Sequence, residues 1–102
     1  MISRSKTPNK LRIPDETADL IRSLHPQLKR KIKAGLRDIL SNPHVGKSLK
    51  EDLEGLLSYR VGRFRIIYRI ASKRIIELIA IGPRKTIYEE TYIALKKEAG
   101  KN

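Results

Sequence analysis

The apolar residues of this chain change their spacing near its middle, and this change restricts the fold more than any other feature. Between residues 28 and 40 they recur every three or four positions, the period of a helix that buries one face. From residue 57 onward they alternate with polar residues, the period of a strand. Helices followed by strands predict an α+β fold.

Prolines and a glycine organise the helical part. Asp15 and Glu16 place negative charge at the start of a first helix. Pro26 ends that helix and begins a second one, which stops before Pro43. Gly35 in the second helix costs about 0.5–1 kcal/mol relative to Ala, so we expect a neighbouring element to approach closely there. The two helices are predicted to form a helical hairpin.

Three runs in the second half are predicted to be strands. Residues 57–61 and 64–70 alternate on either side of a tight turn at Gly62, the pattern of a β-hairpin. Residues 75–81 are apolar on both alternating sets, as expected for a central strand. Residues 10–13 are expected to form a short edge strand. The helical hairpin should therefore pack on a small, mainly antiparallel sheet of three to four strands.

The domain is predicted to end with a short helix or extension over residues 86–97. Ile87, Tyr92 and Leu95 are its candidates to pack on the sheet, although Tyr92 also suits an exposed position. We assign residues 1–9 to a flexible basic tail, 10–97 to a single domain and 98–102 to a flexible C-terminus.

Composition argues against several classes of protein. Cysteine is absent, so the chain has neither disulfides nor thiolate metal sites. His25 and His44 are expected to be a helix cap or surface residues rather than metal ligands. No apolar run approaches the roughly 18 residues of a membrane span. We expect a cytoplasmic protein with no metal, no cofactor and no membrane partner.

Charge points to an anionic partner. The chain has 23 Lys and Arg against 11 Asp and Glu, a net charge of +12. Arg60, Arg65 and Arg69 are expected on one face of the hairpin, and Arg84 follows the third strand. A single arginine there would suit a solvated, ion-paired face. Several arginines converging from two strands favour the binding of phosphates, which guanidinium groups fork around.

Two motifs follow the helical hairpin in this order: YRVGRFRIIY at residues 59–68 and IAIGPRKTIY at residues 79–88. Together they resemble the RelE/ParE superfamily of bacterial toxins. The resemblance extends from about residue 11 to residue 92, and it implies a helical hairpin packed on a sheet whose opposite face is basic. RelE-type members cleave messenger RNA on the ribosome, whereas ParE-type members poison DNA gyrase.

The resemblance to the RelE branch implies a catalytic site. Arg65 and Arg84 match arginines that stabilise the scissile phosphate, and Tyr88 matches a tyrosine near the attacking 2′-hydroxyl. Tyr88 is expected to act as a base or as a stacking platform, and Lys47 or Lys50 is the alternative group for proton transfer. Such a metal-independent endoribonuclease leaves 2′,3′-cyclic phosphate ends. The RNA-binding residues are expected to be Lys47, Lys50, Arg60, Arg63, Arg69 and Lys85.

We therefore predict a ribosome-dependent messenger RNA endoribonuclease toxin. Its expected partners are the ribosome, messenger RNA and a cognate antitoxin, and the antitoxin is implied by the resemblance alone. A ParE-type gyrase inhibitor without nuclease activity is the alternative. A member that lacks nuclease activity and binds only its antitoxin is a third possibility.

Overall fold

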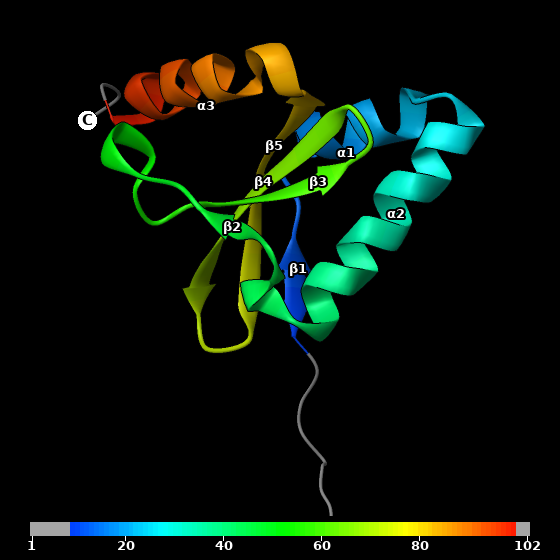
Figure 1. Ribbon diagram of the computed structural model, residues 1–102, viewed down its shortest axis with the longest axis horizontal. Coiled ribbons are helices and arrows are strands. Elements are labelled where there is room, and N and C mark those ends of the chain that lie inside the picture. The colour runs from blue at the N-terminus through cyan, green and yellow to red at the C-terminus, as the bar shows by residue number, and fades with distance from the viewer. Residues whose placement is uncertain (1–8, 100–102) are drawn as a thin grey trace, which may run out of the picture.

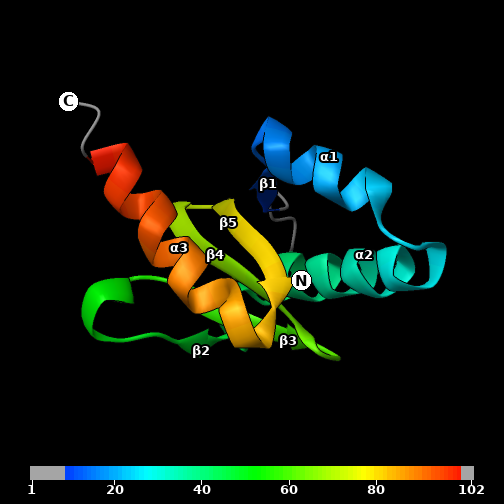
Figure 2. The same cartoon turned by 90° about the horizontal axis from the view of Figure 1, so that it is seen from above.

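Helices cover both faces of a five-stranded sheet in the computed structural model, which describes residues 9–99 (Figure 1, Figure 2). Helices α1 (Asp15–Ser23) and α2 (Pro26–Ser41) pack on one face, and α3 (Arg84–Ala99) packs on the other. The strands are β1 (Lys10–Arg12), β2 (Lys47–Ser48), β3 (Leu57–Val61), β4 (Phe64–Ser72) and β5 (Ile75–Pro83). Their order is β1-β5-β4-β3-β2, with β1 parallel to β5 and the other pairs antiparallel.

The α+β class and the order of elements are confirmed, and the sheet has one strand more than the predicted maximum. β1 is the predicted edge strand, and β5 lies between β1 and β4. The additional strand, β2, has only two residues, which pair with Ser58 and Leu57 of β3. Because two residues cannot show an alternating pattern, no periodic signal marks this strand.

The helical hairpin has its predicted boundaries. The Nδ1 atom of His25 accepts a hydrogen bond of 3.2 Å from the Gln27 N–H, which caps α2, and Pro26 occupies the first turn. His44 is exposed in the short 3₁₀ turn Pro43–Val45 that follows α2. Both histidines therefore occupy the kind of position predicted for them.

Gly35 lies where α2 rests directly on β3 and β4. A Cβ atom there would lie 2.9 Å from Val61 Cγ2, 3.2 Å from Tyr59 Cε2 and 3.3 Å from Ile66 Cδ1. These distances leave too little room for a side chain, which confirms the close approach predicted at this glycine.

Alternate side chains of β4 pack into two apolar cores, one on each face of the sheet. Ile66 and Tyr68 face α1 and α2, whereas Ile67 packs with Leu56 and Ile87 beneath α3. Tyr68 is completely buried, and its hydroxyl donates to the Pro43 carbonyl (2.7 Å) and accepts from the Gly46 N–H (3.0 Å). These bonds tie the segment after α2 to the middle of the sheet.

The last helix is longer than predicted and begins earlier. Ile87 and Leu95 pack on the sheet as expected, whereas Tyr92 is exposed with the Lys96 ammonium over its ring. Thr91 is fully buried, and its hydroxyl is satisfied because it donates to the Ile87 carbonyl within the helix.

The predicted domain boundaries differ slightly from the ordered fold. Asn9, assigned to the tail, donates a hydrogen bond of 2.7 Å to the Leu40 carbonyl, and α3 continues to Ala99. The remainder of the two predicted flexible ends, residues 1–8 and 100–102, lies outside the described residues.

Candidate nucleic-acid interface

A basic cavity opens on the α3 side of the sheet. Its volume is about 340 Å³, and it is lined by Lys47, Leu49, Lys50, Leu53, Arg65, Arg84 and Tyr88. The lining includes all three predicted catalytic residues and both lysines proposed as alternatives for proton transfer. The fold thus brings together groups from the β2 loop, β4 and α3 that are up to about forty positions apart in the sequence.

Apolar anchors hold the loop that supplies the two lysines. Leu49 and Leu53 pack against the smaller core, so Lys47 and Lys50 remain exposed at the rim of the cavity. Glu51, at the start of the 3₁₀ turn Glu51–Leu53, has φ 56, a left-handed conformation that non-glycine residues rarely adopt. The loop is therefore held in a specific conformation.

Arg65 has an unpaired buried donor. Its side chain is half-buried, and its Nε is buried without a hydrogen-bond acceptor among residues 9–99. Arg65 also pairs directly with Arg60 across the hairpin, and like charges opposite each other destabilise a sheet. An unsatisfied buried donor costs about 1–3 kcal/mol, so an external anion would relieve both the unpaired donor and the repulsion.

Arg84 joins this cavity to a second one. It begins α3, and its backbone N–H donates to the Arg63 carbonyl at 2.9 Å, which fixes the helix start beside the hairpin turn. The first turn of α3 contains no acidic residue, so the partial positive charge of the helix terminus adds to that of the side chains. The second cavity, of about 500 Å³, is lined by Arg60, Gly62, Arg63, Pro83, Arg84 and Lys85.

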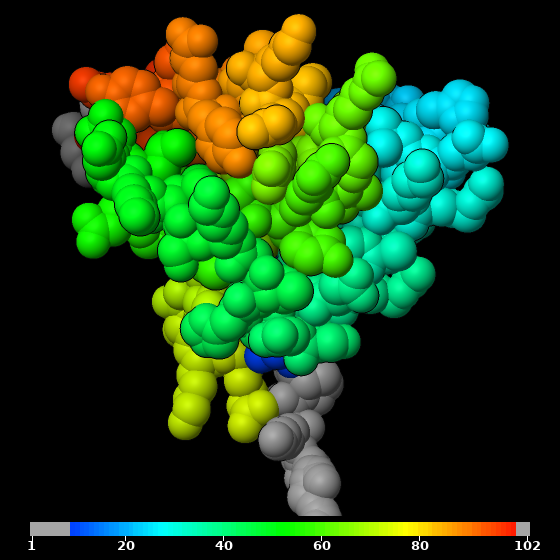
Figure 3. Space-filling model, in the orientation of Figure 1, coloured from blue at the N-terminus to red at the C-terminus, as the bar shows by residue number. Residues whose placement is uncertain are grey.

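The two cavities together contain every predicted RNA-binding residue except Arg69. In Figure 3, the segment after β2, the hairpin tip and the first turns of α3 lie side by side on one face of the molecule. The two cavities meet at Arg84, which lines both, and we call their seven cations the basic face: Lys47, Lys50, Arg60, Arg63, Arg65, Arg84 and Lys85.

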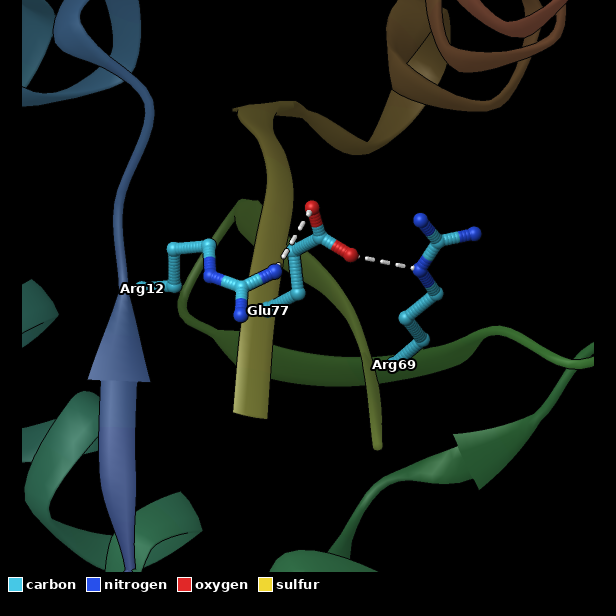
Figure 4. A network of polar contacts seen from close by, with 3 residues as sticks. All are labelled: Arg12, Arg69 and Glu77. Atoms are coloured by element: carbon cyan, nitrogen blue, oxygen red, sulfur yellow. Dashed lines mark hydrogen bonds and ion pairs between the residues drawn. The ribbon is translucent and has the colours of Figure 1, made fainter. Parts of the chain in front are cut away.

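Arg69 lies outside both cavities. Its Nε donates to Glu77 Oε1 at 2.7 Å, and the other oxygen of Glu77 lies 3.8 Å from Arg12 Nη1 (Figure 4). The carboxylate thus bridges β1 and β4 across β5. The structure does not bring Arg69 together with the other predicted site residues, and its charge is engaged by this carboxylate.

Ser58 is a site residue that the sequence pattern did not single out. Its hydroxyl lies 3.0 Å from that of Tyr88, and either group can donate. Ser58 is only 2% exposed, so the bond orients the half-buried phenol at the cavity wall. Alternation places Ser58 on the same face as Arg60, and this shared face was the available signal.

Two kinds of feature are absent from residues 9–99. No group of three or more His, Asp or Glu side chains in this part of the chain is arranged to hold a metal ion. None of its helices is both long and apolar enough to cross a membrane.

Known proteins match both the sequence and the fold. Residues 11–88 match the family described as ParE toxin of type II toxin–antitoxin system, parDE. The toxin RelE of Mycobacterium tuberculosis (strain ATCC 25618 / H37Rv) is 44% identical over 52 residues, which cover 49% of this chain and 54% of that toxin. The chain therefore spans about half the length of this curated relative.

Solved structures of toxins have the same fold. The toxin–antitoxin complex RelBE2 from Mycobacterium tuberculosis contains a chain with a TM-score of 0.66 and 25% identity, covering 76% of this chain and 100% of that one. A mutant of the E. coli toxin RelE in the free state gives a TM-score of 0.69 at 18% identity, covering 89% of this chain and 98% of that one.

Proposed function

Because its sequence matches the family over residues 11–88, this chain belongs to the RelE/ParE superfamily of toxins of type II toxin–antitoxin systems, and we propose that it is a ribosome-dependent endoribonuclease of messenger RNA. The observation that carries the proposal is the first cavity, where Arg65, Arg84 and Tyr88 converge. The buried and unpaired Nε of Arg65 is a donor suited to a phosphate oxygen.

The proposed reaction uses the RNA's own nucleophile. The 2′-oxygen loses its proton and attacks the adjacent phosphorus, the bond from phosphorus to the 5′-oxygen breaks, and a proton is added to that oxygen. The products are a 2′,3′-cyclic phosphate and a 5′-hydroxyl. Negative charge builds on the phosphate oxygens in the transition state, and Arg65 and Arg84 would stabilise it.

Proton transfer has three candidates in the cavity. Tyr88 is fixed by its bond to Ser58, which suits either a base or a platform on which a nucleobase stacks. Lys47 and Lys50 stand at the rim of the same cavity. The remaining cations of the basic face, Arg60, Arg63 and Lys85, would hold flanking phosphates of the messenger.

A cognate antitoxin is the proposed partner that keeps the toxin inactive. The similar chain from Mycobacterium tuberculosis comes from a toxin–antitoxin complex, which supports this proposal. A net charge of +12 favours an antitoxin with an acidic segment over the basic face.

A second candidate function is the inhibition of DNA gyrase. The matched family is described by the name ParE, and the ParE branch of the superfamily has that target. In this case the basic face would bind protein or DNA, and the convergence of Arg65, Arg84 and Tyr88 would have no chemical role.

Primer extension on a translated messenger after induction separates the two functions. The wild type should give codon-phased cuts, and Arg65→Ala and Arg84→Ala should each lower single-turnover cleavage by about two to three orders of magnitude. Arg69→Ala is a matched control, since Arg69 lies on β4 outside both cavities. Wild-type cleavage by Arg84→Ala, or gyrase–DNA cleavage complexes without RNA cuts, would overturn the nuclease proposal.

A further inference from the structure

A second basic surface lies on α2, on the other side of the sheet from the basic face (Figure 1). Lys33 lies four positions from both Lys29 and Arg37, and Arg30 lies three positions before Lys33, so Lys29, Arg30, Lys33 and Arg37 share one side of the helix. Arg30, Lys33 and Arg37 are exposed and Lys29 is half-buried. We call these four residues the α2 stripe.

The α2 stripe is not neutralised within the fold. None of its four residues forms an ion pair with another residue in the range 9–99. The helix contains one acidic residue, Asp38, and its carboxylate accepts the Tyr59 hydroxyl at 2.7 Å. The positive charge of the stripe therefore faces solvent.

This arrangement opposes the stability of the helix. Like charges four positions apart, as at Lys29 and Lys33, cost a few tenths of a kcal/mol per pair, roughly 0.2–0.5. The first turn of α2 has no acidic residue and its last turn no basic one, the reverse of what the helix dipole favours. The preceding helix, α1, has the favourable arrangement, with Asp15 and Glu16 in its first turn and Arg22 in its last turn.

We propose that the α2 stripe binds the phosphate backbone of double-stranded RNA while the basic face holds the strand to be cleaved. The inference rests on the proposed function, which requires a partner with structured RNA. At 1.5 Å per residue the stripe is about 12 Å long, enough to follow several phosphates. Only Lys and Arg make up the stripe, so it suits recognition of RNA by shape and charge rather than by base sequence.

The test compares two variants of equal charge. Lys29→Gln/Lys33→Gln/Arg37→Gln removes three charges from the stripe, and Lys10→Gln/Lys73→Gln/Lys97→Gln removes three exposed charges elsewhere. The probes are purified ribosomes and an RNA hairpin of about 16 base pairs. The stripe variant should bind both at least about tenfold more weakly than the control, and the slope of log affinity against log salt should fall by about two to three.

Folding and the nuclease proposal are monitored separately. The stripe variant should melt no lower than the wild type, because it removes repulsion within α2. Cleavage of the messenger is measured on the same samples, so a wild-type protein that binds both probes without cleaving would count against the nuclease function and leave the stripe inference intact. Equal affinities of the two charge variants would overturn the inference. Tighter binding of a DNA duplex of the same length, or loss of antitoxin binding alone, would also overturn it.

Discussion

The role of the Tyr88 hydroxyl can be tested directly, because a single neighbouring side chain orients it. Its hydroxyl lies 3.0 Å from that of the buried Ser58. Tyr88→Phe keeps a stacking ring and removes the hydroxyl. We expect a clear loss of single-turnover cleavage on programmed ribosomes if the phenol moves the proton.

Ser58→Ala provides the matched control for that prediction. It keeps the phenol but removes the group that orients it, so cleavage should fall less than in Tyr88→Phe. Full activity in Tyr88→Phe would reduce Tyr88 to a stacking platform and move proton transfer to Lys47, Lys50 or the ribosome.

Two other tyrosines, Tyr68 and Tyr59, are expected to make the domain less stable at alkaline pH. Burial raises the pKa of Tyr68, although the Gly46 N–H opposes the shift. The hydrogen bond to Asp38, then burial and the charge of Asp38, raise the pKa of Tyr59. Since an unfolded tyrosine titrates near pH 10, the folded state retains protons above that pH, and the free energy of unfolding should fall as the pH rises through this range.

Phenolate absorbance in an alkaline titration measures this effect. Tyr68→Phe should lose a late step of the wild-type curve, and its stability should vary less with pH above about pH 10. The comparison is made between wild type and variant rather than on either alone. Loss of an early step would contradict the prediction.

Elements with a strong period were predictable from the sequence. The helical hairpin and the β3–β4 hairpin follow from apolar spacing, proline and glycine, each of which acts on the local backbone. β2 was not found, since its two residues are defined only by pairing with β3. The start of α3 at Arg84 was also missed, because a bond to the Arg63 carbonyl, distant in sequence, fixes it.

The sequence predicted which residues line the candidate site better than it predicted how they are arranged. Alternation correctly grouped Arg60 with Arg65, which pair across the hairpin. It could not show that Arg69 pairs with Glu77 outside the cavities, since that contact depends on the register of β4 and β5. Ser58 was overlooked because a small polar residue on an alternating strand usually faces solvent.

The junction of α2 with the sheet gives a prediction about packing. Gly35→Val places a branched side chain where atoms of Val61, Tyr59 and Ile66 already lie within 3.3 Å of the position that its Cβ would take. Overpacking of this kind costs about 1–3 kcal/mol, and we expect the denaturant midpoint to fall accordingly. Lys31→Val adds the same branched side chain at an exposed position of α2 and should change stability much less. Valine has a better helix propensity than glycine, so backbone preference alone would not lower the stability of Gly35→Val. A loss no larger than that of Lys31→Val would contradict the packing prediction.

The whole molecule carries positive charge that ion pairs within its fold do not neutralise. The basic face and the α2 stripe lie on opposite sides of the sheet. A partner that neutralises both must therefore wrap around the protein, and a smaller partner would cover only one side. Electrostatic attraction of this kind speeds association and weakens with salt.

This excess charge leads to a prediction about the antitoxin. The gene adjacent to this one should encode a small acidic protein that co-purifies with the toxin, because opposite charge favours the complex and covers the basic face. A ligand that binds only the folded state at about a thousand times its Kd adds roughly 4 kcal/mol to the free energy of unfolding. The melting temperature of the toxin should therefore rise when the partner is added, and the rise should shrink with added salt. An unrelated acidic protein of similar size serves as the control. If no neighbouring gene product raises the melting temperature beyond that control, the proposed toxin–antitoxin partnership fails.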